Sequence, residues 1–432
     1  MKKQFIFILC GLFLCAGTIA ATDYNVLQQG AVGDGKTLNT KSLQSAIDAL
    51  HAKGGGQLYF PAGRYLTGSL QLKSNVTLYL EKEAVLLGST SPYDYPGFST
   101  EKELKVNNDH FDQALIYAEG AENIGITGEG CIDGQGRELA LTIDSLHHTG
   151  ELVDKHYNTY RKRPNTRPKL LFMRNCRKVE LRKTDFRSGA AWGLSFSLCT
   201  DLTIDSLHVE NRAYWNNDGI DISDCKDVRI SNCFINSADD GICLKSHNRG
   251  AWNDRVSISN CHIISSASAI KFGTESLGGF KNVTIDNIRV KDTFRSAIAI
   301  ESVDGAEIEN VKLENIEIVC PGRATRGMAY MSVSRLKDVP ENEKGYPEFT
   351  MFEELPSWGF YVRHVKGIQM HNVKLRLQED DFRPAFVFDR VSDVRLSDIS
   401  LPENKKAGQV VLRQTNLQSA DNAVKEYVRE VE

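Results

Sequence analysis

Short runs of alternating apolar and polar residues recur along most of this chain, and Gly, Asn, Asp and Ser separate the runs. Related segments are CRKVEL (176–181), CTDLTI (199–204), CKDVRI (225–230), NDRVSI (253–258), FKNVTI (280–285), GAEIEN (305–310), VKGIQM (365–370) and VSDVRL (391–396). The aligned apolar positions are 23, 26, 28, 27 and 25 residues apart at Val179, Leu202, Val228, Val256, Val283 and Ile308. Alternation over such short runs predicts β-strands rather than helices.

Repeats of this length cannot bury their apolar faces alone, so they must stack on one another. We predict an all-β fold, a single parallel β-helix over residues 22–432, with one coil per repeat. The Leu spacing of a leucine-rich-repeat horseshoe is absent from this sequence. A propeller blade needs about 40 residues, which is longer than these repeats. Residues 40–55 predict a short amphipathic helix that covers the open first coil.

Stacked coils place equivalent residues above one another, so the repeat predicts two inward columns. The first column holds Cys176, Cys199 and Cys225, and the second holds Asn232, Asn260 and Asn287. We expect the cysteines to be small buried thiols without disulfide bonds, because ligands in a column do not converge on a metal ion. Buried Asn side chains can satisfy backbone groups at a turn.

The N-terminus resembles a secretory signal. Residues 1–21 carry two lysines directly after Met1, continue with an apolar run over 5–14 and end in small residues. We therefore expect an exported protein, periplasmic or extracellular, without stable membrane insertion, since the run is too short to span a bilayer comfortably. The formal net charge is −4 and basic residues do not cluster, which argues against nucleic acid as a partner. A monomer is expected.

Three aspartates stand at the heads of two predicted strands, in DGIDI (218–222) and DDGICL (239–244). Adjacent parallel strands lie about 4.8 Å apart, so Asp218 and Asp240 should be neighbours with Asp239 beside them. Ionised carboxylates this close repel one another, and at least one pKa should rise. A set of turn-forming aspartates or a cation site would be a structural explanation. The strain favours acid–base chemistry, in which a carboxylic acid protonates a leaving oxygen and carboxylates activate water.

These motifs resemble glycoside hydrolase family 28, the polygalacturonase and rhamnogalacturonase family, over nearly all of residues 22–432. The resemblance is carried by QQGAVGDGKTLNTKSLQSAID (28–48), NNDGIDI (216–222) and SADDGICLKS (237–246). It implies a right-handed, pectin-lyase-like β-helix that hydrolyses pectic polysaccharide or oligosaccharide with inversion, without a metal or other cofactor. By position it makes Asp239 the general acid. Asp218 and Asp240 would hold and deprotonate the water, and Asn216 would support the site.

Two departures from the family pattern concern the substrate. Ser268 occupies the position of the His in the family's Gly-His-Gly motif, and Ala299-Ile300-Glu301 replaces its Arg-Ile-Lys motif. Lys271 and Lys245, on neighbouring coils, are therefore candidates for binding a sugar carboxylate. Otherwise the bound sugar is neutral, and Glu301 accepts a hydroxyl hydrogen bond. Both interpretations argue against plain polygalacturonan as the substrate.

Two insertions, residues 137–168 and 319–360, carry His, Arg and aromatic side chains and are predicted to wall the binding cleft, which would favour exo action. Two alternative functions stay open. A polysaccharide lyase on the same fold would leave an unsaturated product that absorbs ultraviolet light. A non-catalytic carbohydrate-binding β-helix would tolerate Asp239→Asn with little loss.

Overall fold

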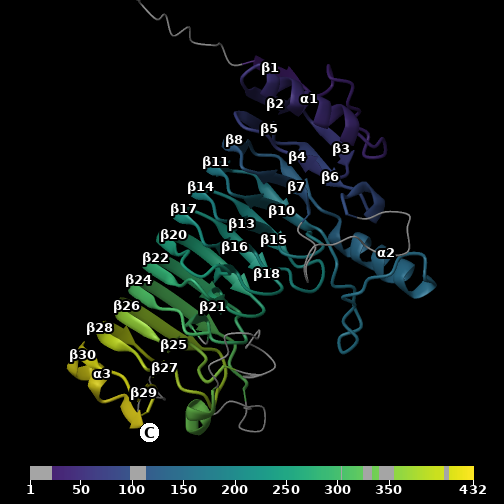
Figure 1. The fold of residues 1–432 in the computed structure, drawn as a ribbon. Helices are drawn as coiled ribbons and strands as arrows, with labels where there is room; N and C mark the ends of the chain where they lie inside the picture. The colour runs from purple at the N-terminus through teal and green to yellow at the C-terminus, as the bar shows by residue number, and fades with distance from the viewer. Residues whose placement is uncertain (1–21, 98–112, 303, 325–332, 340–354, 403–407) are drawn as a thin grey trace, which may run out of the picture.

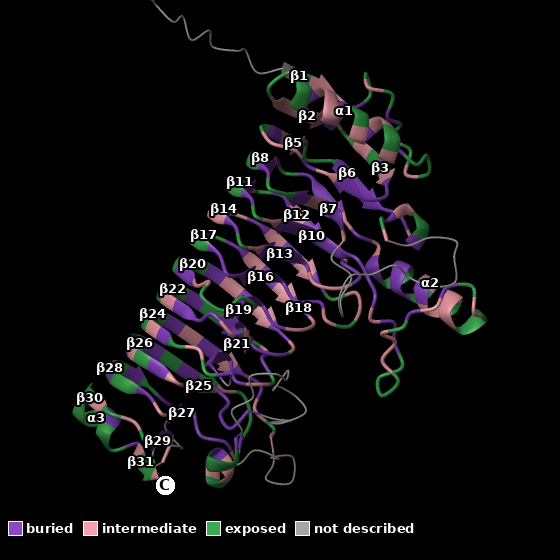
Figure 2. Ribbon diagram, viewed as in Figure 1, coloured by how far each residue is buried: buried purple, intermediate pink, exposed green. Residues whose placement is uncertain are grey.

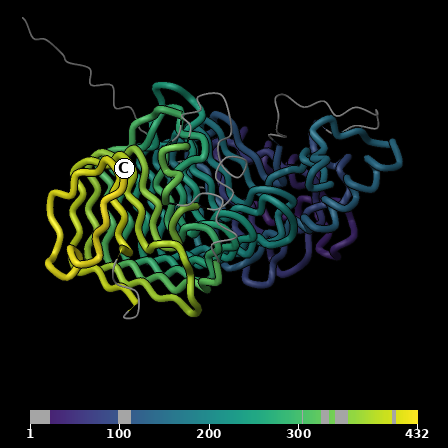
Figure 3. The backbone as a smooth tube through the Cα atoms, turned by 90° about the horizontal axis from the view of Figure 1, so that it is seen from below, coloured from purple at the N-terminus to yellow at the C-terminus, as the bar shows by residue number. Residues whose placement is uncertain are grey.

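The computed structural model describes residues 22–97, 113–302, 304–324, 333–339, 355–402 and 408–432. The predicted signal sequence and parts of the 319–360 insertion lie outside these residues. The described chain forms a stack of β-coils that follow one another along a single axis (Figures 1 and 3). No helix among the described residues combines the length and the apolar character needed to cross a membrane.

One face of the stack is a parallel sheet, twelve strands wide in the described part of the chain. Its strands are β4 (Leu70–Gln71), β7 (Ala114–Glu119), β10 (Lys169–Arg174), β13 (Leu194–Ser197), β16 (Ile220–Ser223), β19 (Ile242–Ser246), β21 (Ile270–Ser276), β23 (Ile298–Glu301), β25 (Phe360–Arg363), β27 (Phe386–Asp389), β29 (Val410–Arg413) and β31 (Val428–Val431). Each strand pairs with the equivalent strand of the next coil, which confirms the predicted parallel β-helix.

The remaining strands form a second parallel sheet that bends around the other sides of the stack. They are β1 (Thr22–Asn25), β2 (Gly56–Phe60), β3 (Gly63–Thr67), β5 (Val76–Leu80), β6 (Ala84–Gly88), β8 (Glu122–Thr127), β9 (Cys131–Asp133), β11 (Arg177–Arg182), β12 (Asp185–Arg187), β14 (Thr200–Asp205), β15 (His208–Asn211), β17 (Lys226–Ser231), β18 (Phe234–Ser237), β20 (Asn253–Ser265), β22 (Phe280–Lys291), β24 (Ile308–Cys320), β26 (Val365–Leu377), β28 (Ser392–Ser400) and β30 (Leu417–Ala420).

The core is built from columns of apolar side chains, one residue per coil. Buried residues recur along the successive coils (Figure 2). Leu202, Val228, Val256 and Val283 pair in register as the repeat predicts. The next member of this column is Val311, so the alignment on Ile308 was wrong by three residues. Ile308, Val311 and Leu313 are all buried in β24, so the apolar pattern alone fits more than one register.

Helix α1 (Thr40–Ala52) covers the first coil, as predicted (Figure 1). Its buried face consists of Leu43, Ala46, Ile47 and Leu50, which are spaced for one side of a helix. The helix ends before Gly54, whose φ of 96° lies in the left-handed region that glycine adopts easily. The cap gives the apolar interior of the first coil a partner instead of water.

The cysteine column is confirmed. Cys176, Cys199 and Cys225 are buried and free, and the backbone N–H groups of Cys176 and Cys199 donate to the sulfur of the next coil's cysteine. Asn253 continues the column, and its Oδ1 accepts the N–H of Cys225 at 2.9 Å. All eight cysteines of the described chain are free and buried.

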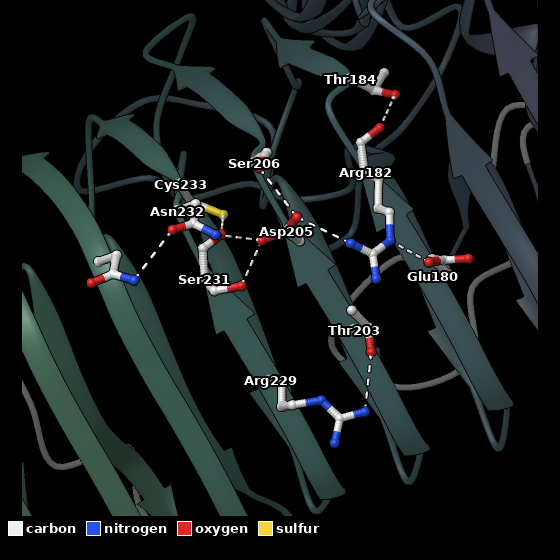
Figure 4. Close-up of polar contacts among 11 residues, drawn as sticks. Glu180, Arg182, Thr184, Thr203, Asp205, Ser206, Arg229, Ser231, Asn232 and Cys233 are labelled. Carbon is white, nitrogen blue, oxygen red and sulfur yellow. Dashed lines mark hydrogen bonds and ion pairs between the residues drawn. The ribbon is translucent and has the colours of Figure 1, made fainter.

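The asparagine column exists, but its predicted inward orientation is wrong. Asn232, Asn260 and Asn287 are exposed at a corner of the coil, with φ between 51° and 57°. Asn tolerates this left-handed conformation, which turns the side chain outward. Each amide donates to the oxygen of the preceding coil's side chain. The ladder begins at Asp205, which accepts from Asn232 (Figure 4). Hydrogen bonds from Ser231, Asn232 and Ser206 outweigh the effect of burial and lower the pKa of Asp205.

Both predicted insertions contain helical segments in their described parts. Residues 137–168 contain helix α2 (Gly136–Thr149), which sequence reasoning took for a loop, followed by an irregular segment. The described part of 319–360 contains the 3-10 helix η2 (Val333–Asp338). It contributes to a second apolar cluster on the outer side of the sheet, made of Ala299, Leu336, Val339, Leu355, Tyr361, Val387 and Val411. Short helices η1 (Pro92–Asp94) and α3 (Asn422–Lys425) complete the described structure.

Candidate active site

The predicted catalytic aspartates lie where β16 and β19 begin. The two strands pair in parallel, with Ile220 opposite Ile242 and Asp221 opposite Cys243. The glycines that follow Asp218 and Asp240 are required by the stacking, because a Cβ on Gly219 would lie 2.4 Å from the carbonyl oxygen of Gly241. The repeated Asp-Gly pair therefore combines close contact between coils with a carboxylate on each coil.

The structure brings four carboxylates together, one more than the sequence singled out. Asp218 and Asp240 are 4% and 3% exposed, Asp221 is fully buried, and Asp239 is partly exposed. Asp221 belongs to the DGIDI motif, but sequence reasoning gave it no role, because an outward-facing Asp in a strand is ordinarily solvated. The structure shows that this side chain is covered.

Both predicted substrate-binding lysines are buried against these carboxylates. Lys245 Nζ is 3.7 Å from Asp221 Oδ1 and 4.0 Å from Asp218 Oδ2. Lys271 Nζ is 3.4 Å from Asp240 Oδ2 and donates to Thr274 Oγ1 at 3.1 Å. Neither lysine is a solvated surface residue. In the described structure their positive charge faces the aspartates, which reduces the cost of burying them together.

Trp192 lies at the head of the coil before Asp218, and its ring faces two cations. Lys245 Nζ and Lys169 Nζ are each 4.9 Å from the ring centroid. The ring's negative face attracts an ammonium group. Sequence reasoning assigned neither Trp192 nor Lys169 a role.

Burial raises the pKa of two of the aspartates. The pKa of Asp218 is well above its ordinary range because of burial and the neighbouring Asp221 and Asp239 charges, which Lys245 opposes. Burial raises the pKa of Asp221 to about 6, against the opposing charges of Lys245 and Lys169. Asp218 Oδ1 and both Asp221 carboxylate oxygens have no hydrogen-bond partner in the described structure. The expected rise in pKa within the cluster is confirmed.

Asp239 is the most accessible of the four carboxylates, and its backbone is firmly held. Its carbonyl oxygen accepts hydrogen bonds from Ser237 Oγ at 2.8 Å and Ser265 Oγ at 2.7 Å. Its Oδ1 accepts the N–H of Asp240 at 3.2 Å. This fixed geometry suits a group that transfers a proton to a bound molecule.

Ser268 and Glu301, two further predicted substrate contacts, are buried. The N–H of Ser268 donates to Asp240 Oδ1 at 3.1 Å, so this residue acts on the site through its backbone. Glu301 is 1% exposed at the end of β23 and pairs in register with Arg363 of β25. Ala299 lies between Lys271 and Tyr361 in the strand register.

Asn216, the remaining predicted site residue, is held by the 137–168 insertion. Its Oδ1 accepts hydrogen bonds from Arg163 Nη1 and, at 3.0 Å, from Arg167 Nη2. Arg163 and Arg167 are both buried. Sequence reasoning noted these arginines only as members of a charged loop, because nothing in a loop without periodicity indicates which residue it will contact.

Comparisons with known proteins identify the family of this chain. Residues 56–321 match Glycosyl hydrolases family 28, and residues 24–81 match a family described as Rhamnogalacturonase A/epimerase, pectate lyase-like. Over 321 residues the chain is 30% identical to a probable polygalacturonase of Vitis vinifera, which covers 70% of this chain and 60% of that protein. An exo-poly-alpha-D-galacturonosidase of Dickeya chrysanthemi is 28% identical over 248 residues, covering 50% of this chain and 41% of that protein. The chain thus spans about half of these relatives.

The solved structure of a family 28 exopolygalacturonase from Yersinia enterocolitica superposes with a TM-score of 0.63 at 22% identity. The match covers 95% of this chain and 77% of that one. Polygalacturonase from Erwinia carotovora gives a TM-score of 0.62 at 18% identity, over 90% of this chain and 96% of that one. At these identities the likeness shows the fold, a pectin-lyase-like β-helix.

Proposed function

The chain belongs to glycosyl hydrolase family 28, and on that premise we propose that it is a polygalacturonase-like hydrolase of pectic polysaccharide or oligosaccharide. The observation that carries the proposal is the group of four neighbouring carboxylates with Lys245 and Lys271 buried against them. Such a group favours catalysis over structure, since burying several carboxylates together destabilises a fold.

In the proposed mechanism Asp239 is the general acid, which donates a proton to the oxygen of the leaving sugar. Its partial exposure and fixed backbone support this role. Asp218 and Asp240 hold a water molecule and accept its proton as it attacks the anomeric carbon. Attack from the side opposite the leaving group inverts that carbon, and both carboxylate roles fit general acid–base catalysis.

The two lysines support these roles, because their positive charges lie against the carboxylates. Lys271 Nζ lies 3.4 Å from Asp240 Oδ2. The charge of Lys245 opposes the rise that burial causes in the pKa values of Asp218 and Asp221. A carboxylate that must accept a proton has to be ionised first, which burial alone would oppose. We propose that the main role of both lysines is to place positive charge next to the catalytic carboxylates.

The proposed substrate is acidic overall, but it differs from plain polygalacturonan where it binds near positions 299–301. Ala299 and Glu301 provide no cation there, in contrast to the Arg-Ile-Lys motif of the family. We further propose that the protein is exported, since residues 1–21 have the composition of a secretory signal.

One digestion experiment tests the proposal. Purified protein is incubated with galacturonan, rhamnogalacturonan and substituted galacturonan oligosaccharides, and the products are analysed by mass and by absorbance. Hydrolysis adds one water per cleaved bond, whereas a lyase product absorbs ultraviolet light. Asp239→Asn should abolish cleavage, and Asp201→Asn is the matched control because the Asp201 side chain on β14 is partly exposed, at 46%. Cleavage that persists in Asp239→Asn would contradict the proposed mechanism.

A further inference from the structure

The 137–168 insertion places two buried arginines beside the catalytic group. Arg163 is 5% exposed and Arg167 is 3% exposed. In addition to Asn216 Oδ1, Arg167 donates to the backbone oxygens of Trp215 at 2.6 Å and Pro164 at 2.9 Å. All of these acceptors are neutral. Within the described part of the chain, neither guanidinium forms an ion pair with a carboxylate, and Arg163 Nε has no hydrogen-bond partner.

Two buried cations without a close anion are unfavourable. Burial and the charge of Arg163 lower the pKa of Arg167 to about 9. Burial and the charge of Arg161 lower the pKa of Arg163, and the carboxylate of Asp239 acts in the opposite direction. Asp239 lies beside this group, because its backbone N–H donates to the carbonyl oxygen of Asn217, the residue after Asn216, at 3.2 Å. Buried charges are normally paired, so this arrangement suits an anionic group brought by a ligand.

The arginines also determine which way the Asn216 amide points. A guanidinium has N–H donors and no acceptor, so the atom of Asn216 that faces both arginines must be the oxygen. The amide nitrogen therefore faces the other way. Asn216 is only half-buried, so its two N–H donors are available to a bound molecule.

An aromatic platform lies next to these donors. Trp215 is 47% exposed, and Arg161 and Arg163 lie 5.5 and 5.4 Å from its ring centroid. An exposed indole ring beside charged donors is a suitable surface for the apolar face of a sugar.

The insertion that carries the arginines is ordered by a single buried carboxylate. Asp154 accepts hydrogen bonds from the backbone N–H groups of Asn165 at 2.7 Å, Thr166 at 2.9 Å and His156 at 2.9 Å. Thr166 Oγ1 also donates to it, at 2.7 Å. Arg163 and Asn158 exchange backbone hydrogen bonds on the other side of this turn. The arginines are therefore preorganised, which reduces the entropy lost on binding.

We propose that Arg163, the Asn216 amide and the Trp215 ring form a subsite for a carboxylate-bearing sugar next to Asp239. This inference rests on the proposed function and names the residues that make the site specific for acidic substrate. The subsite supplies the positive charge that positions 299–301 lack, from a different part of the chain. Arg167 acts as a positioning residue, since its donors are occupied by Asn216 and by backbone oxygens.

The test compares one substrate with and without its charge. Acidic pectic oligosaccharides and the same oligosaccharides with their carboxyl groups reduced to alcohols are given to wild type and Arg163→Gln. A hydrogen bond to a charged group contributes enough to predict a loss of about 10- to 100-fold in kcat/KM on the acidic substrate. On the reduced substrate the loss should be less than about threefold. Added salt should narrow the wild type's preference for the acidic substrate.

Two variants serve as controls. Arg229→Gln removes the same charge from an exposed position on β17 and should match wild type. Arg163→Lys keeps the charge but not the planar fork, so it should recover part of the activity on acidic substrate. Thermal unfolding must show that Arg163→Gln is folded. An equal loss on both substrates in a folded variant would overturn the proposal, because Arg163 would then only hold the loop.

Binding separates this inference from the proposed function. Calorimetry with Asp239→Asn and an acidic oligosaccharide measures the subsite without turnover. If wild type cleaves nothing in the panel but still binds acidic oligosaccharide through Arg163, the hydrolase proposal fails and the subsite stands. If cleavage occurs and neither binding nor kcat/KM responds to Arg163→Gln, the subsite proposal fails alone.

Discussion

Removing the charge of Lys245 is expected to raise the pH at which activity begins. Its Nζ lies 3.7 Å from Asp221 Oδ1 and 4.0 Å from Asp218 Oδ2, and these side chains are at most 5% exposed. At an effective dielectric constant of about 20, each of these pairs interacts by about 4 kcal/mol. Because one pKa unit corresponds to about 1.4 kcal/mol, loss of one pair is equivalent to about three units on the pH axis at full strength.

The direction follows from the charge states. Burial and neighbouring carboxylates raise the pKa of Asp218, and Lys245 opposes that rise. Lys245→Met keeps an apolar stem of similar length near Trp192 but removes the cation. Asp218 would then ionise only at higher pH, and the acidic limb of kcat/KM should move upward by about one unit or more. Water entering the vacated space weakens the effect, so the full Coulomb value is an upper bound.

The assay measures kcat/KM across the acidic and neutral range at constant ionic strength. Lys245→Arg should leave the limb near that of wild type because it keeps the charge. Lys281→Met is the matched control, since Lys281 also lies over an indole ring, 4.6 Å from that of Trp252. If the acidic limb of the kcat/KM profile does not shift in folded Lys245→Met, the idea that Lys245 controls the ionisation of Asp218 is refuted. If that variant is inactive, carbon NMR of the aspartate carboxyl groups measures the same ionisation directly.

Three further predictions concern the mechanism and the coils. Asp239→Asn should lose at least about 100-fold in turnover, with an unchanged unfolding temperature. NMR of early wild-type products should show the inverted anomer, and a retained anomer would contradict the mechanism. Alkylation of denatured, unreduced protein should label all eight described cysteines, and an unlabelled pair would indicate a disulfide bond. Asn260→Ala should lower the free energy of unfolding by about 1 kcal/mol in a denaturant titration, because it removes the amide hydrogen bonds. Asn260→Gly should lower it by less if backbone strain at φ 54° contributes more than the lost hydrogen bonds, since Gly adopts this conformation easily.

Sequence reasoning predicted the coils well because the physical signal repeats. Each coil must bury the same apolar position against the next coil. This single requirement places four residues in one register: Ile220, Ile242, Ile270 and Ile298. An error in one repeat is corrected by its neighbours. The misplaced Ile308 shows where this fails, in a strand that offers several buried apolar residues to the same column.

The site was predictable only in part. Asp218, Asp239 and Asp240 could be found because they interrupt the strand pattern at equivalent places. The burial of Lys245 and Lys271 could not, because it depends on what covers the outer face of the sheet. The contacts of Arg163 and Arg167 with Asn216 join segments about 50 residues apart through a non-repeating loop. No local pattern encodes such a contact.

The buried carboxylate of Asp154 has a consequence for how this protein could diverge. It accepts hydrogen bonds from the loop's own backbone and hydroxyl groups, so bonds internal to the insertion help to hold residues 154–166, in addition to the contact of Arg163 with Asn216. The coils beneath carry the reacting groups and are constrained by stacking above and below. A lineage could therefore exchange the insertion as a cassette and acquire a new substrate preference in one recombination event, while the catalytic coils stay unchanged.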